Sequence, residues 1–116
     1  MWFKVVGKNY SDIDYSAYGV GDTIVDHIPF NDTNEGCVPG GIYFTTLNRI
    51  PNFLDYGDRL LKISIPVDAQ VKHFTGKSRA SSIQIEAEWP LWSPEAWCMI
   101  LDAGGTNLNK TLRQVS

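Results

Sequence analysis

Apolar residues recur at every second position in several short stretches of the chain, which is the period of a β-strand with one buried face. Between Asp58 and Pro66, the apolar residues Leu61, Ile63 and Ile65 alternate with polar ones. Proline cannot donate to a sheet ladder, so Pro66 is expected to end the stretch. The pattern predicts a half-buried strand.

A longer alternating stretch runs from Ser81 to Trp89 and predicts a second strand of this kind. Its predicted core face carries Ile83, Ile85, Ala87 and Trp89, and its predicted solvent face carries Gln84, Glu86 and Glu88. The turn-forming residues Thr75–Lys77 precede it, and residues 70–74 before them are extended in pattern. Residues 70–74 and 81–89 are therefore predicted to be strands on either side of a turn.

Three further extended stretches are expected. Trp2–Val6 is rich in aromatic and β-branched residues and predicts an opening strand. Residues 42–46 follow Gly40 and Gly41, one of which is expected to have a positive φ, and they predict a buried strand. Residues 22–30 contain the apolar residues Ile24, Val25, Ile28 and Phe30, and because Pro29 bars them from the middle of a sheet they predict an edge strand or an ordered loop.

Helix signals occur at two places. The first predicted helix begins near Asn48 and ends at Gly57, and the second begins at Pro94, is capped by Ser93 and ends at Gly104. The residues expected to face inward are Ile50, Phe53 and Leu54 in the first helix, and Trp97, Ile100 and Leu101 in the second. Strands and helices together predict an α+β fold, with an antiparallel or mixed sheet packed by two helices.

Composition restricts the function classes. A chain of 116 residues with 43% hydrophobic residues predicts one folded domain, residues 1–116. The net charge of -3 predicts no nucleic-acid binding, and the N-terminus lacks the apolar run of a signal peptide or membrane span. A cytoplasmic protein is therefore expected. Two cysteines, Cys37 and Cys98, are too few for a disulfide framework, and Cys98 is expected to be buried.

Familiar catalytic and metal motifs are incomplete. The sequence His73–Ser78 resembles the end of a phosphate-binding loop, but Val71 stands where that motif requires glycine, so a hairpin turn is expected there. The two histidines and two cysteines have no pair at ligand spacing, and no metal is predicted. Asp26 and His27 are an acid–base pair only if another segment orients them, because neighbouring strand residues point to opposite faces.

Residues Pro29–Val71 resemble an uncharacterised domain of large DNA viruses of amoebae and of some microbial proteins. The similarity rests on four motifs, which are Phe30-Asn31, Cys37-x-Pro39-Gly40-Gly41, Tyr43-Phe44-Thr45 and Tyr56-Gly57. This resemblance implies kinship and carries no assigned chemistry.

The order of a glycine-led aromatic strand, a helix, Tyr56-Gly57, a strand and Pro66 also resembles the ADP-ribosyltransferase-like fold. That resemblance implies NAD as cofactor. It places Lys4 where the family has arginine or histidine, and it puts the second-strand site at Gly41, Tyr43, Thr45 and Thr46. The catalytic carboxylate would be Glu86, preceded by Gln84, or Glu88.

Two functions therefore stay open. The first is a small ADP-ribosyltransferase-like domain that binds NAD or transfers ADP-ribose. The second is a non-enzymatic protein-binding module, such as a viral accessory or inhibitor protein in the host cytoplasm, that presents Trp2, Trp89, Trp92 and an acidic strand face to a host or cellular protein. In the second case Glu86 and Glu88 belong to a solvated strand face.

Overall fold

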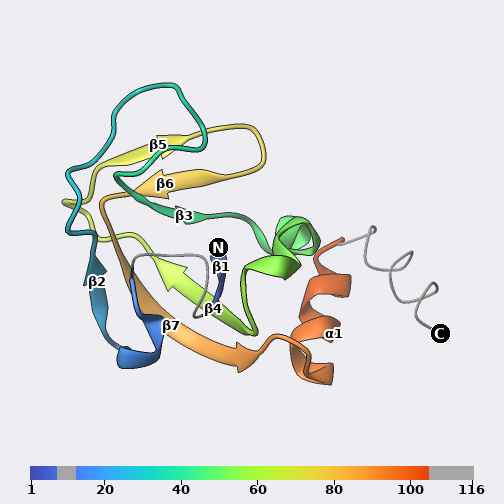
Figure 1. Cartoon of the computed structure of the whole chain (residues 1–116). Helices are drawn as coiled ribbons and strands as arrows, with labels where there is room; N and C mark the ends of the chain where they lie inside the picture. Colours follow the sequence, from blue (N-terminus) through green and yellow to red (C-terminus); the bar gives the residue numbers. More distant parts are fainter. Residues whose placement is uncertain (8–12, 105–116) are drawn as a thin grey trace.

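The computed structural model describes residues 1–7 and 13–104, which form two antiparallel sheets flanked by helices (Figure 1). The first sheet has the strand order β1-β4-β7-β2, with β1 at Trp2–Val6, β4 at Arg59–Ser64, β7 at Ser82–Pro90 and β2 at Thr23–Val25. The second sheet has the order β3-β6-β5, with β3 at Ile42–Phe44, β6 at Ser78–Ala80 and β5 at Val71–His73. The predicted α+β class is confirmed, but the strands divide between two sheets.

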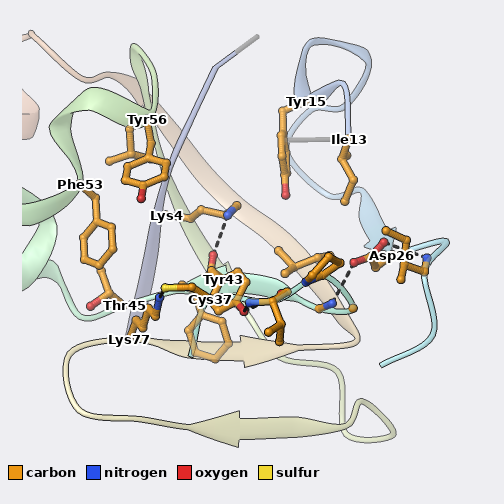
Figure 2. A pocket seen from close by; sticks show the side chains of 18 of the residues that line it. Lys4, Ile13, Tyr15, Asp26, Cys37, Tyr43, Thr45, Phe53, Tyr56 and Lys77 are labelled. Atoms are coloured by element: carbon orange, nitrogen blue, oxygen red, sulfur yellow. Dashed lines mark hydrogen bonds between the residues drawn. The ribbon is translucent and has the colours of Figure 1, made fainter. Parts of the chain in front are cut away.

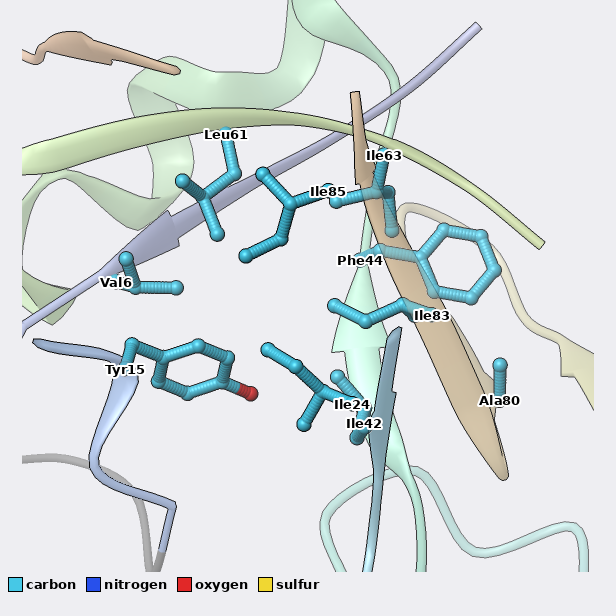
Figure 3. Close-up of a cluster of buried hydrophobic side chains, with 10 residues drawn as sticks. All are labelled: Val6, Tyr15, Ile24, Ile42, Phe44, Leu61, Ile63, Ala80, Ile83 and Ile85. Carbon is cyan, nitrogen blue, oxygen red and sulfur yellow. The ribbon is translucent and has the colours of Figure 1, made fainter. Parts of the chain in front are cut away.

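One face of the first sheet packs against the second sheet. Their shared core contains Leu61, Ile63, Ile83 and Ile85 from the first sheet and Ile42, Phe44 and Ala80 from the second, with Val6, Tyr15 and Ile24 around them (Figure 3). Tyr15 belongs to a single 3₁₀ turn, η1, at Tyr15–Ala17. The isolated bridge between Phe3 and Thr45 links β1 to the chain just after β3, so the two sheets meet along β1.

The other face of the first sheet packs against two helices. These are η2, a 3₁₀ helix at Leu47–Tyr56, and α1, an α-helix at Pro94–Asp102. The buried residues of this second core are Phe3, Val5, Ile50, Leu60, Leu91, Ala96, Trp97 and Ile100. Because Leu60 and Leu61 enter opposite cores, β4 is covered on both faces where a half-buried strand was predicted.

The predicted hairpin forms with a different second strand. Phe74 N–H donates to the Lys77 carbonyl over 2.9 Å, and the residues that follow form β6, which pairs with β5. The chain then leaves the second sheet near Ser81 and enters β7 of the first sheet. Local periodicity did not predict this change of sheet, because it depends on which distant strand offers a free edge.

A β-bulge interrupts the alternation of β7. Lys62 and Ile63 are neighbours on β4, yet they pair with Ala87 and Ile85, so Glu86 is the extra residue. Beyond the bulge the even-numbered residues point to the face that the odd-numbered residues occupy before it. Ile83 and Ile85 lie in the core between the sheets as predicted. Ala87 pairs with Lys62 and Trp89 pairs with Leu60, which places both on the face toward the helices, so the prediction of one shared face is wrong for them.

The helix predicted from Asn48 to Gly57 is the 3₁₀ helix η2, and Ile50, Phe53 and Leu54 face the core as expected. The helix ends at Gly57 as predicted, but Gly57 has a φ of 161°, which is extended backbone and not the left-handed conformation of a glycine cap. Glycine is required because a Cβ there would lie 2.0 Å from the Val6 carbonyl oxygen.

Helix α1 follows its sequence signals at the start. The Ser93 hydroxyl accepts the Ala96 N–H over 3.2 Å, and Trp97 and Ile100 are buried as predicted. Leu101 is 38% exposed and Cys98 is also exposed, so the predictions of inward packing for Leu101 and burial for Cys98 are wrong. The helix packs along one stripe, and successive residues turn away from it. Within the described residues, no helix has the length and apolar character needed to cross a membrane.

Candidate functional site

A cavity of about 630 Å³ opens beside β1 and β3, where the two sheets meet (Figure 2). We call it the groove. Its walls include apolar residues from β1, β3, η2 and the loop before β3. The polar or ionisable side chains that line it include Lys4, Tyr15, Asp26, Cys37, Tyr43 and Lys77. Its volume lies within the range of small-molecule sites, which is about 300 to 1,000 Å³.

Lys4 is the central cation of the groove. It pairs with Leu61 across the sheet, so it lies on the face that looks toward the second sheet. Its Nζ donates to the Tyr43 carbonyl oxygen over 2.7 Å and lies 5.5 Å from the centre of the Tyr15 ring. Among the described residues, no carboxylate lies within ion-pair distance of Lys4.

This environment changes the acid–base behaviour of Lys4. Burial lowers its pKa from 10.5 to about 8, because desolvation disfavours the charged ammonium. A carboxylate neighbour would have opposed that shift. Lysines whose pKa is lowered by burial in a cleft cluster at functional sites.

Tyr43 and the loop before it form the wall opposite Lys4. The Tyr43 hydroxyl accepts the Val38 N–H over 3.0 Å and donates to the Val38 carbonyl over 2.8 Å. Gly40 has a φ of 97° and Gly41 a φ of 151°, which confirms the predicted positive φ. The two hydrogen bonds between the Tyr43 hydroxyl and Val38 therefore hold the turn that precedes β3 against β3 itself.

Two further contacts hold the rim. The Asp26 carboxylate accepts the Gly41 N–H over 2.9 Å and the Ile28 N–H over 3.0 Å. It therefore links the backbone before β3 to the backbone after β2. Lys77 Nζ lies 2.9 Å from Cys37 Sγ and 4.9 Å from the centre of the Tyr43 ring. A positive charge therefore stands at the rim as well as inside the groove.

Arg79 supports this wall from behind, and the sequence analysis missed it. It is fully buried; Nη1 donates to the Glu35 carbonyl over 2.6 Å and Nη2 to the Thr33 carbonyl over 2.7 Å. Nη1 also lies 3.1 Å from the Tyr43 hydroxyl, and the Phe74 ring centre is 4.9 Å from the guanidinium carbon. No sequence signal marked it, because Ser78–Ala80 has no apolar alternation and follows directly after the predicted turn at Thr75–Lys77.

Arg79→Lys should lower the free energy of unfolding by about 2 kcal/mol, because an ammonium cannot reproduce the planar fork that reaches two carbonyls. Urea denaturation of both proteins measures the difference. Arg49→Lys is the matched control, since Arg49 is exposed, and it should change the free energy by less than about 0.5 kcal/mol. Similar losses in the two variants would show that the fork at Arg79 contributes nothing.

The structure brings together four of the residues named by the transferase resemblance. Lys4, Gly41, Tyr43 and Thr45 all line the groove. The Thr45 hydroxyl donates to the Gly76 carbonyl over 2.8 Å, so it has a structural partner. Thr46 does not line the groove, and its hydroxyl donates to the Asn48 side chain at the start of η2.

The residues Gln84, Glu86 and Glu88 do not line the groove. Glu86 accepts a hydrogen bond from the Ser64 hydroxyl, and Glu88 forms an ion pair with Arg59. Glu88 pairs with Leu61, which places it on the face of Lys4, two strands away. The bulge at Glu86 separates the two glutamates, so they do not share a face as the uninterrupted period predicted.

Metal-binding groups are not assembled in the part of the chain that the structure describes, where no three such side chains cluster. Asp26 Oδ1 and His27 Nδ1 are 3.7 Å apart. Both residues follow the end of β2, so their side chains are not forced to opposite faces as those of neighbouring strand residues are. The His27 side chain is 69% exposed, away from the enclosed part of the groove. This pair has no orienting third group among the described contacts.

No family model matches the chain, and no solved structure matches it at a significant level. Three proteins of Acanthamoeba polyphaga mimivirus that are named as ankyrin repeat proteins are similar to it. Identity is 38% over 66 residues for one of them, 32% over 69 residues for another and 51% over 41 residues for a third. These segments cover 57%, 59% and 35% of this chain.

The same segments cover 19%, 33% and 13% of the three relatives, so the chain spans a minor part of each. Homologous sequence therefore occurs in a giant virus.

Proposed function

We propose that this domain binds NAD, or the ADP-ribose part of it, in the groove, as an ADP-ribosyltransferase-like domain. The observation that carries the proposal is Lys4, a cation inside a cavity with no carboxylate in ion-pair distance among the described residues. Burying a charge without a counter-charge is costly, so the site favours an anionic ligand. A diphosphate supplies that charge.

The remaining groove residues support the same ligand class. Lys77 at the rim is a second cation for a diphosphate, since lysine binds phosphate as a point charge. The rings of Tyr43, Phe53 and Tyr56 line the cavity and offer apolar surfaces to a nicotinamide or adenine ring.

Transfer of ADP-ribose needs a carboxylate where positive charge develops on the ribose. Of the two glutamates, Glu88 pairs with Leu61, which itself pairs with Lys4, so Glu88 is on the same face of the sheet as Lys4, but it lies outside the groove and is paired with Arg59. Cleavage therefore requires Glu88 to leave Arg59 and reach the ribose. If it does, Glu88→Gln should abolish NAD cleavage, with Glu86→Gln as its matched control.

Binding is tested by titrating NAD while recording amide NMR spectra. Resonances near Lys4 and Tyr43 should shift, and Lys4→Met should weaken the affinity at least about tenfold because it removes the buried cation. Lys62→Met is the control, since Lys62 points to the opposite face of β4 and does not line the groove.

An unchanged spectrum of the unsubstituted protein at about 10 mM NAD would contradict the proposal, because it leaves less than about 3 kcal/mol of binding free energy. Equal weakening by Lys4→Met and Lys62→Met would contradict the role given to Lys4.

A protein-binding module is the second candidate, and a specific exposed surface favours it. Trp92 is 58% exposed, and its ring centre lies 4.9 Å from that of Trp97 on α1. Trp2 and Trp89 pack against the two cores, so they contribute less. Exposed tryptophans are enriched at protein interfaces. This function predicts no response to NAD.

A further inference from the structure

We propose that Lys4 is an amine nucleophile that condenses with the carbonyl group of an aldehyde or ketone ligand in the groove and forms an imine. The inference rests on the proposed function in one respect, namely that the groove admits a small ligand. It adds a covalent step and a ligand class, carbonyl compounds.

The geometry of Lys4 leaves its nitrogen available. An ammonium has three donor positions, and the described structure uses one of them, toward the Tyr43 carbonyl. The side chain lines the cavity, and Figure 2 shows its nitrogen beside the Tyr43 carbonyl and on the side of Tyr15. A ligand that enters the groove can therefore approach the nitrogen directly.

The local environment also favours the neutral amine, the form that attacks a carbonyl. With its pKa lowered to about 8, Lys4 is roughly one-tenth neutral at pH 7. A lysine with the ordinary pKa of about 10.4 is less than about one-thousandth neutral at that pH. Desolvated lysines in apolar pockets act as Schiff-base nucleophiles for this reason.

The groups that share the groove do not oppose this chemistry. Its other titratable residues are Tyr15, Asp26, Cys37, Tyr43, Tyr56 and Lys77. The Asp26 carboxylate accepts two backbone N–H groups and forms no ion pair with Lys4. Lys77 stands at the rim, where it can hold an anionic group of a ligand whose carbonyl carbon reaches Lys4.

The reaction needs no oxidant or cofactor. The Lys4 nitrogen lone pair forms a C–N bond to the carbonyl carbon, and the C=O π electrons move to oxygen, which takes up one proton as the nitrogen gives one up. The resulting carbinolamine takes up a second proton on that oxygen and loses it as water while the C=N bond forms, and the nitrogen releases its second proton to give the neutral imine. One amine and one carbonyl compound therefore give one imine and one water. NAD lacks a free aldehyde, whereas the open-chain form of ADP-ribose has one at the reducing carbon.

Borohydride trapping tests the proposal on the whole chain. The protein is mixed with pyridoxal 5′-phosphate or with ADP-ribose, the imine is reduced, and the modified lysine is located by peptide mass spectrometry. Lys4 should be labelled at least about tenfold faster than Lys62 and Lys72 in the same sample at pH 7. The rate at Lys4 should rise with pH and level off above about 8, where the amine is neutral.

Lys4→Arg tests where the adduct forms. The guanidinium forms no trappable imine, so the adduct at residue 4 should be lost. NAD binding is followed separately, by NMR of the unsubstituted protein, so the two proposals can fail independently. Lys62→Arg should leave labelling of Lys4 unchanged.

Labelling of Lys4 at no more than the rate of Lys62 and Lys72 would overturn the imine proposal whether or not NAD binds. Because that comparison is made within one sample of the unsubstituted protein, it does not depend on the variants folding.

Discussion

Gly57→Ala should lower the free energy of unfolding by about 4 kcal/mol or more, which is an exceptional loss for one methyl group. A Cβ at Gly57 would lie 2.0 Å from the Val6 carbonyl oxygen and 2.5 Å from the Gly7 nitrogen. Both atoms are backbone, so no side-chain rotation relieves the clash. The next residue, Asp58, donates its N–H to the same Val6 carbonyl over 3.1 Å.

Urea denaturation of the variant measures this loss, with Gly19→Ala as the matched control. A Cβ at Gly19 would meet nothing within 4 Å, so alanine there should change the free energy by less than about 1 kcal/mol. If the two variants unfold at the same urea concentration, the close approach of β1 to the end of η2 is not real.

Ile85→Ala should cost about 2 to 5 kcal/mol, because Ile85 is 1% exposed and sits in the core between the two sheets. Three residues along the same strand, Glu88 has a side chain that is 39% exposed and forms an ion pair with Arg59. Glu88→Ala should cost less than about 1 kcal/mol, since ion pairs at the surface contribute little.

The two variants should be compared in one chemical denaturation series. Equal costs would contradict the register in which β7 pairs with β4, since that register buries Ile85 and exposes Glu88.

Part of the candidate site could be predicted before the structure was known. The resemblance pointed to Lys4, Gly41, Tyr43 and Thr45, which line one groove. It also pointed to three residues of β7, which lie outside the groove. The bulge at Glu86 puts Glu86 and Glu88 on different faces of the sheet. A sequence with a period of two does not reveal such an extra residue, because the bulge is defined by the pairing with β4.

Arg79 shows why the remaining parts of the site escaped prediction. Its partners Thr33 and Glu35 are 46 and 44 residues away in the chain. A buried arginine is costly unless its donors are satisfied, and the acceptors here are backbone carbonyls of a loop with no distinctive sequence. The sequence around Arg79 therefore does not indicate whether its side chain is buried in the protein or exposed to solvent.

The sequence by itself determined the features that depend on neighbours in the chain. Ser93 caps α1, Gly40 takes a positive φ, and the period of two buries Ile83 and Ile85, because backbone geometry and side-chain direction act over a few residues. The tertiary structure alone decided that the strands form two sheets and that Lys4 meets the Tyr43 carbonyl, 39 residues away, inside a cavity. Strand pairing joins segments distant in sequence, and it is chosen by the packing of the whole core rather than by any one stretch.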